Sequence, residues 1–194
     1  MQNVRILRDL HWSDRYQIEQ FEKLEFLWEN KRMKISEQIF PRVVALICTS
    51  SKEGKPNVMT ASFSMPISFK PKILAVSIAP TRYSFENLKE VQEFTLNILT
   101  KEMKEIAKIC GSFSGRKVDK FKMAKLEIEK SKKVLPPVIK NCPISLECKV
   151  LEMKEFGDHF LVVGEVLEEW IRKEKFDPLL QKTGEIYMVA KNLK

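Results

Sequence analysis

The segment GKPNVMTASFSMPIS, Gly54 to Ser68, carries the clearest signal for the fold and also raises the question of function. It combines a turn signal with an amide, several small hydroxyl residues and apolar spacers, and almost nothing in it is charged. Residues 57–64 read as a strand, which would present Asn57, Thr60 and Ser62 beside its own backbone amides. Two interpretations stay open: these side chains donate hydrogen bonds to a planar ligand, or they belong to an ordinary half-buried strand.

Further strand-like runs lie on both sides of this segment. They are apolar, rich in β-branched residues and of strand length, and turn residues separate them. Pro66 and Pro71 predict a loop before the next run, and Gly157-Asp158 predicts a hairpin turn. The predicted runs are RVVALICTS (42–50), KILAVSIA (72–79), EFTLNIL (93–99), ISLECKVLEM (144–153), HFLVVGEVLEEWI (159–171) and EIYMVAKNL (185–193).

Only short helices separate these runs. Ser84 predicts the N-cap of one helix. A second helix is expected to be capped by Thr100 and closed by Gly111. Its apolar face would consist of Met103, Ile106, Ala107 and Cys110. Because strands and helices do not alternate regularly, the sequence predicts a mainly β, α+β fold, with an antiparallel sheet or barrel and helices packed outside it.

Residues 1–38 differ in character from the rest of the chain. Asp14 and Gln17 have capping-box-like spacing. Apolar residues follow at helical intervals, namely Ile18, Phe21, Leu24 and Trp28. We therefore expect an N-terminal helical extension over 1–38 and a second domain over 39–194. The apolar face of the extension would pack on its own domain or clasp a partner subunit.

Composition and charge limit the classes of function. The 194 residues are 44% apolar and 31% charged, which is typical of one globular core. The net charge is +8, but 34 basic residues are interspersed with 26 acidic ones, so we expect no nucleic-acid partner and favour attraction of anionic small molecules. No run is long enough to span a membrane, and the start lacks a signal-peptide pattern, so we expect a cytoplasmic protein with no membrane partner.

Cysteine and histidine usage argues against metal and triad chemistry. The four cysteines form no CxxC pair and are expected to be free, buried thiols. Only His11 and His159 are present, which leaves too few ligands for a histidine-built metal site and few candidates for a Ser-His-Asp triad. No metal is expected.

The segment APTRYSFEN, residues 79–87, has features of a phosphate site. Arg82 stands two residues before Ser84, at the start of a predicted helix. A helix N-terminus offers unpaired amide protons and the positive end of the dipole, and a guanidinium beside it suits a phosphate. The alternative is an ordinary capped helix.

Two later segments also concentrate polar residues. CGSFSGRKVDKF (110–121) sets glycines and serines beside Arg116 and Lys120, as in a flexible anion-binding loop, although it lacks the Walker spacing. FGDHFLVVGEV (156–166) places His159 at the start of an otherwise apolar strand. Taken singly, the first also fits a solvated basic loop and the second a structural histidine.

Together these segments resemble the flavin reductase-like family, the FMN-binding split-barrel proteins that include flavoredoxins. The resemblance runs in unbroken order from about Pro41 to Val166, through GKPNVMTAS, PKILAVSIAPTRYSFENL, EFTLNI, CGSFSGRKVDKF, CPISLECKV and GDHFLVVGEV. It implies a six-stranded antiparallel Greek-key split β-barrel with peripheral helices. It also implies a homodimer with FMN bound near the subunit interface.

The resemblance implies site residues as well. Those lining the isoalloxazine and ribityl chain would be Asn57, Met59, Thr60, Ala61 and Ser62, with Ser77 and Ile78 approaching from the neighbouring strand. Those holding the phosphate would be Arg82, Ser84 and Asn87, with Lys120 and Arg116 reaching in. His159 would lie near the flavin and the incoming nicotinamide and is the expected catalytic residue. Phe63 stands where relatives commonly have tryptophan.

Three functions remain open, two that the resemblance implies and one from another class. The first is an FMN-binding oxidoreductase that takes electrons from NAD(P)H and passes them to free flavin, iron or another small acceptor. The second is a flavoredoxin-type electron carrier whose bound FMN is reduced by a partner redox protein. The third is a basic interaction module without a cofactor.

Overall fold

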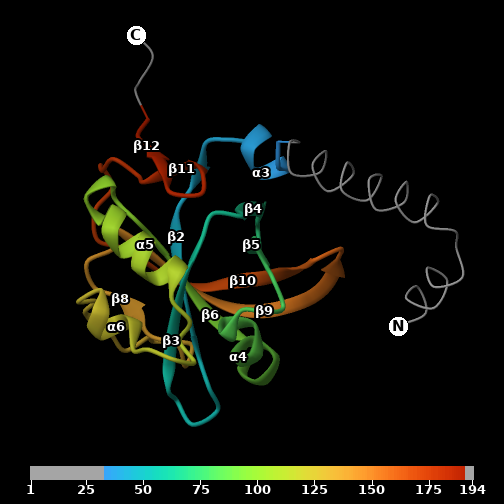
Figure 1. The fold of residues 1–194 in the computed structure, drawn as a ribbon. Helices are drawn as coiled ribbons and strands as arrows, with labels where there is room; N and C mark the ends of the chain where they lie inside the picture. Colours follow the sequence, from blue (N-terminus) through green and yellow to red (C-terminus); the bar gives the residue numbers. More distant parts are fainter. Residues whose placement is uncertain (1–32, 191–194) are drawn as a thin grey trace, which may run out of the picture. The chain divides into compact units, whose positions relative to one another are not determined.

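The computed structural model describes residues 33–190 (Figure 1). The chain divides into two units, residues 1–39 and 40–194. In the first unit, the described part contains helix α3 (Ile35–Gln38). The predicted amphipathic helix around Asp14 to Trp28 lies outside the described residues, and the predicted division into an extension and a flavin-binding domain stays a prediction.

The second unit is built on one antiparallel sheet of seven strands, in the order β3-β2-β6-β9-β10-β5-β4. Every neighbouring pair in this sheet is antiparallel. The strands are β2 (Ala45–Ser50), β3 (Pro56–Ala61), β4 (Ser64–Phe69), β5 (Lys72–Ile78), β6 (Glu93–Ile98), β9 (Ile144–Phe156) and β10 (His159–Ile171).

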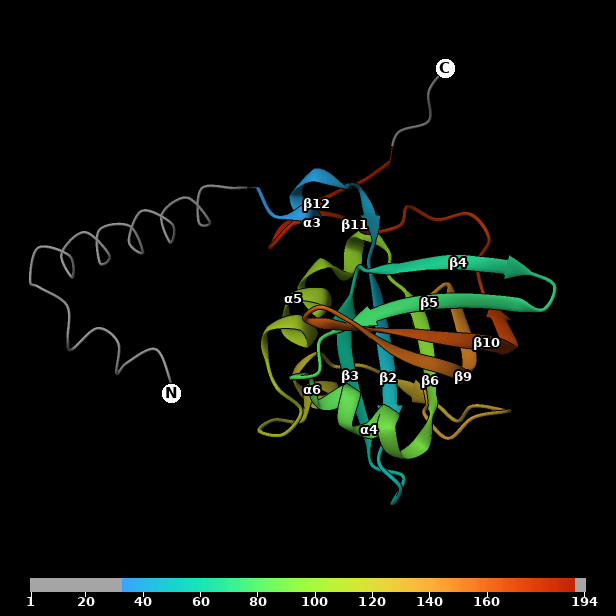
Figure 2. The same ribbon diagram turned by 90° about the vertical axis from the view of Figure 1, so that its right-hand side faces the viewer.

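The two edge strands of this sheet, β3 and β4, follow one another in the sequence. Only Ser62 and Phe63 separate the end of β3 from the start of β4. The sheet must therefore curl until its opposite edges meet at this link, and β3 and β4 do not pair with each other. In Figure 2, β2, β3 and β6 run up the view while β4, β5 and β10 cross it, as expected for an open, split barrel.

The predicted mainly β split barrel with peripheral helices is confirmed, but the strand count is seven rather than six. The segment around Pro66, which we expected to be a loop, forms β4. Proline is tolerated there because an edge strand has N–H groups that need no partner, and the β4–β5 register shifts between Pro66 and Ser68.

The predicted hairpin at Gly157-Asp158 is confirmed. It joins β9 and β10, two strands of thirteen residues each. Gly157 has a φ of +62°, a conformation that most other residues adopt only with strain. This long hairpin carries His159 at the first position of β10.

Helices and two small sheets surround the main sheet. The helices are α4 (Tyr83–Val91), the 3₁₀-helix η1 (Lys101–Met103), α5 (Lys104–Ser112) and α6 (Lys120–Met123). The small sheets consist of β1 (Arg42–Val43), β11 (Leu180–Thr183) and β12 (Ile186–Met188), and of β7 (Ile128–Glu129) and β8 (Val138–Ile139). None of the described helices is long and apolar enough to cross a membrane.

Strand β2 separates two apolar clusters and is buried along its whole length. Leu46 and Cys48 pack into one cluster, which includes residues of α5 and β8. Ala45 and Ile47 pack into the other, which includes residues of α4, β5 and β6. Burial of both faces explains why this strand is continuously apolar in the sequence instead of alternating.

Two predicted helix boundaries were wrong. Arg82 is the N-cap of α4, and Ser84 is a buried helical residue rather than the cap. Gly111 lies inside α5, which ends at Ser112. Thr100 is the N-cap residue of η1, as predicted, although its side chain makes no capping hydrogen bond. The predicted apolar face is confirmed along η1 and α5, because Met103, Ala107 and Cys110 are buried in the core and Ile106 packs against it.

Candidate functional site

A cavity of about 200 Å³ lies beside edge strand β3. Strand β3 contacts α4, α5 and α6 (Figure 1). The cavity is lined by this strand edge and by the ends of all three helices. The loop from Phe113 to Arg116 closes one side of the cavity. The predicted site residues that line it are Asn57, Met59, Thr60, Arg82, Ser84, Arg116 and Lys120.

Asn57 and Ser84 fix the floor of the cavity. Both are buried, and the Asn57 Nδ2 group donates a hydrogen bond of 2.7 Å to the Ser84 hydroxyl oxygen. This bond joins β3 to the first turn of α4. In this bond the Ser84 oxygen is the acceptor, so the Ser84 hydroxyl can still donate a hydrogen bond to a ligand.

The loop after α5 approaches this pair closely at Gly115. A Cβ atom added to Gly115 would lie 2.0 Å from the Asn57 Oδ1 atom and 3.2 Å from the Tyr83 ring. No side chain fits in that space, so the sequence Ser-Gly-Arg lets the loop backbone lie directly against β3. The glycine thereby sets the position of Arg116, the next residue.

Arg116 is held by three contacts at the rim of the cavity. Its guanidinium donates 3.2 Å to the Thr81 carbonyl and 2.5 Å to the Glu86 carboxylate, and it lies 5.3 Å from the centre of the Tyr83 ring. Glu86 neutralises part of its charge, and both side chains are substantially exposed. Arg116 is therefore an orienting cation at the rim rather than a buried one.

Lys120 is the buried cation of the site, with 5% of its surface exposed. Its Nζ atom donates 3.1 Å to the Cys110 carbonyl, and no carboxylate pairs with it among residues 33–190. Burial, together with the nearby charge of Arg82, lowers the pKa of Lys120 below its ordinary value. An ammonium group has three donors, so this group can accept an anion without losing its carbonyl partner.

Strand β3 contributes both side chains and an open edge. The Thr60 hydroxyl donates 2.7 Å to the Ala107 carbonyl of α5, and Met59 supplies an apolar surface. Because β3 is an edge strand, its outer backbone groups pair with no other strand in the described part of the chain. A ligand with ring carbonyls and nitrogens can bond to such an edge as a strand would.

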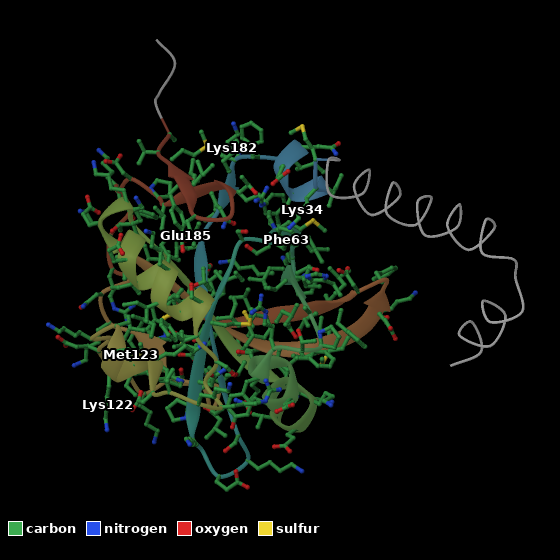
Figure 3. All side chains as sticks on the ribbon, viewed as in Figure 1. Lys34, Phe63, Lys122, Met123, Lys182 and Glu185 are labelled. Atoms are coloured by element: carbon green, nitrogen blue, oxygen red, sulfur yellow. The ribbon has the colours of Figure 1, made fainter. Side chains whose placement is uncertain are left out.

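A second group of predicted residues surrounds Phe63, where β3 passes into β4. The Ser62 hydroxyl donates 2.5 Å to the Gln181 side-chain oxygen. The His159 ring lies 5.9 Å from the Phe63 ring, and its Nδ1 atom is 2.8 Å from the Asp158 carboxylate. Figure 3 shows Phe63 on the other side of α5 from α6, whose Lys122 and Met123 are labelled.

The remaining predicted residues lie away from the cavity. Ala61 and Ile78 are buried in the apolar cluster on the α4 side of β2. The Ser77 amide donates 2.8 Å to the Phe63 carbonyl, which places Ser77 with the second group. The Asn87 amide is buried and donates 3.1 Å to the Thr49 hydroxyl. The assignment of all the predicted site residues to the flavin, including those that line the cavity, stays a prediction.

Sequence reasoning missed two residues of the site. Thr81 and Tyr83 line the cavity beside Arg82. Residues 111–115 also line it, within the segment that the sequence predicted to be an anion-binding loop. The segment CGSFSGR was a usable signal, because its two glycines predict close backbone approach. Tyr83 gave none, since an aromatic residue at a helix start is usually a packing residue.

The predicted free and buried cysteines are confirmed. Burial raises the pKa of Cys110 to about 11, so the thiol beside the cavity is protonated near neutral pH and is a poor nucleophile. Residues 33–190 contain no cluster of side chains able to hold a metal ion. The cations and hydrogen-bond donors that line the cavity can bind an anionic, acceptor-rich ligand.

The open antiparallel barrel places this fold in the class of split barrels. The family model of the flavin reductase-like domain matches residues 37–190. A split-barrel domain structure from Shewanella frigidimarina superposes with a TM-score of 0.76 at 16% identity, covering 97% of this chain and 93% of that one.

Two further relatives are closer in sequence. An uncharacterised protein of Archaeoglobus fulgidus is 40% identical over 131 residues, which are 68% of this chain and 73% of that protein. Flavoredoxin from Methanosarcina acetivorans is 28% identical with a TM-score of 0.74, covering 84% of this chain and 94% of that one. The chain belongs to the flavin reductase-like family.

Proposed function

We propose that this protein is an FMN-binding oxidoreductase. The observation that carries the proposal is the buried Lys120 ammonium, which faces a cavity and lacks a carboxylate partner within residues 33–190. A buried cation is costly unless it is compensated, and the phosphate or the reduced ring of a flavin would compensate it. Membership in the flavin reductase-like family supports the flavin as that anion.

The residues around the cavity fit such a cofactor. Arg82, the Ser84 hydroxyl and the free amides at the start of α4 would hold the phosphate. Asn57, Met59 and Thr60 would lie along the ring, with donors from the open edge of β3. The close approach at Gly115 provides a backbone wall without side chains in the way.

Bound FMN supplies two-electron redox chemistry that no side chain of this protein provides. The protein binds the cofactor, limits water access and stabilises negative charge near the ring with Lys120 or Arg116. His159, held by Asp158, would orient the nicotinamide or donate a hydrogen bond to it.

We propose NAD(P)H as the electron donor and a small molecule, such as free flavin or ferric iron, as the acceptor, in the cytoplasm. The similarity to a flavoredoxin favours one alternative, in which a partner redox protein reduces the bound FMN. The two differ in one property, since only a reductase loses its flavin absorbance when NADH or NADPH alone is added.

A homodimer belongs to this proposal. The cavity of about 200 Å³ is smaller than the roughly 300–1,000 Å³ that is usual for small-molecule sites. A second copy of the chain would add the missing wall and enclose the flavin between subunits.

Anaerobic mixing of the FMN-loaded protein with NADH or NADPH tests the proposal. We expect one of the two nucleotides to bleach the flavin, and His159→Ala to slow bleaching at least tenfold with less than a threefold change in FMN affinity. Glu155→Ala, an exposed change on the same hairpin, serves as the control and should match the wild type. Failure to bind FMN would overturn the proposal, and bleaching by a reduced redox protein alone would select the carrier.

A further inference from the structure

A second, larger cavity of about 840 Å³ adjoins the first. It is a groove between the start of β3, the loop that follows Gly115, and α6 with the residues after it. Its volume is within the range of sites that bind whole small molecules. Four residues line both cavities: Asn57, Gly115, Arg116 and Lys120.

The groove is strongly cationic. Six cations line it: Lys55, Arg116, Lys117, Lys120, Lys122 and Lys125. Its two carboxylates are already engaged, because Asp119 caps α6 and Glu127 lies 3.8 Å from Lys140. Among the described residues, Lys55, Lys117 and Lys125 form no ion pair. The groove therefore holds uncompensated positive charge that a multiply charged anion would neutralise.

The backbone at Lys125 adds to this argument. Its φ is +50°, at the end of α6, in the left-handed region where glycine or asparagine is the usual residue. A residue with a side chain costs about 1 kcal/mol or more in this conformation. Glycine would be more stable than lysine in this conformation, but it would remove a positive charge from the groove.

Part of the groove surface is apolar. Val118, Phe121 and Ile128 contribute to it, and the buried side chains of Val58 and Leu126 lie behind it. A ligand that satisfies both the cations and this surface has a phosphate group joined to a flat, weakly polar ring system. Lys120 and Arg116 line both cavities. A phosphate bound between them could therefore belong to a ligand that extends from the first cavity into the second.

We propose that this groove binds an adenosine 5′-phosphate moiety next to the phosphate of the flavin. The inference rests on the proposed function for the flavin half and adds a subsite for a dinucleotide. Two ligands contain this chemistry: the adenylate half of FAD, covalently continuous with the flavin phosphate, and the ADP half of a pyridine dinucleotide that binds beside FMN.

Equilibrium titrations of the full-length protein, stripped of flavin, distinguish the sources. FMN, FAD and ADP are titrated into the stripped protein, and ADP into the FMN-loaded protein. The test variant is Lys55→Gln with Lys125→Gly, in which the glycine suits the left-handed turn and preserves the fold. The control is Lys104→Gln with Lys149→Gln, which removes the same charge from exposed positions that line neither cavity.

We expect the wild type to bind FAD at least tenfold more tightly than FMN, or to bind ADP when loaded with FMN. The first result identifies a flavin dinucleotide and the second a pyridine dinucleotide. In either case the test variant should lose about tenfold in affinity for that ligand, the usual effect of a lost charge-assisted contact. Its FMN affinity should change less than threefold, and the control should match the wild type.

Other outcomes separate this inference from the proposed function. One outcome would overturn the proposed adenylate subsite and leave the proposed function standing. In that outcome FMN binds normally, FAD binds no more tightly than FMN, ADP does not bind, and the test variant behaves like the wild type. ADP binding that the test variant weakens, without any flavin binding, would overturn the function and support the groove. No binding of any of the three ligands would overturn both.

Discussion

Lys120 is the residue on which the electrostatics of the site depend. Its ammonium is buried, its pKa is lowered by burial and by Arg82, and its hydrogen-bond acceptor is the neutral Cys110 carbonyl. In the protein without a ligand, no carboxylate among residues 33–190 offsets the desolvation cost of this charge. An anionic ligand would offset it, so binding and protonation of Lys120 favour each other.

The affinity for FMN should therefore depend on pH. The protonated form of Lys120 binds the anion, so affinity should hold at neutral pH and fall as the pH rises through the lowered pKa of this lysine. Titrations from about pH 7.5 to about pH 9.5 keep the phosphate a dianion throughout. Lys120→Arg should bind FMN with a flat profile, because a guanidinium stays protonated. A falling profile in both proteins would assign the pH dependence to another group.

At the scale of elements, one buried carboxylate organises the connection between β7 and β8. Glu147 of β9 is fully buried and accepts hydrogen bonds from the Lys132 and Lys133 amides and from the Trp170 indole, at 2.9, 2.6 and 2.6 Å. All three partners are donors, so the site requires an acceptor with two oxygens. The carboxylate thus ties residues 132–133 to the barrel.

We predict that Glu147→Gln lowers the free energy of unfolding by about 1–3 kcal/mol, because the amide group would face a donor and leave it unpaired in the interior. Urea denaturation followed by circular dichroism measures the loss. Glu152→Gln, on the exposed part of β9, removes the same charge and should change stability by less than about 0.5 kcal/mol. Equal effects of the two changes would show that the hydrogen bonds of Glu147 are not the cause.

Elements differ in how well the sequence predicted them, for physical reasons. Strand β2 and the β9–β10 hairpin carry local signals: an apolar run of strand length and a glycine at a positive φ. Strand β4 does not, because its proline is allowed only by its place at a sheet edge, which is a tertiary property. The burial of Lys120 and the contact of Gly115 with Asn57 likewise depend on segments about 60 residues apart in sequence, beyond the reach of local patterns.

At the scale of the whole molecule, β4 leaves an exposed apolar edge. The strand contains no charged residue, and Met65 and Phe69 are 55% and 93% exposed. Long apolar edge strands promote association unless charge or cover protects them. The predicted homodimer would cover this edge with a second copy of the chain.

Light scattering after size exclusion should give a mass of twice 22.7 kDa for the wild type. Met65→Lys should shift the population towards the monomer, because it places a charge on the apolar edge. Phe156→Lys, which changes another exposed apolar residue at the hairpin tip, should leave the dimer intact. A monomeric wild type would contradict the homodimer, and a dimer unaffected by Met65→Lys would place the contact elsewhere.

The two-residue link between β3 and β4 also limits the distance between the two groups of predicted site residues. Thr60 at the cavity and Phe63 beside His159 are three residues apart, so their Cα atoms cannot be separated by more than about 11 Å. One molecule lying along β3 can thus contact both the cavity and the surroundings of Phe63. The covalent geometry of the chain sets this distance limit, and side-chain packing does not. Lengthening the link by a single residue would release that limit, whatever else in the protein stayed unchanged.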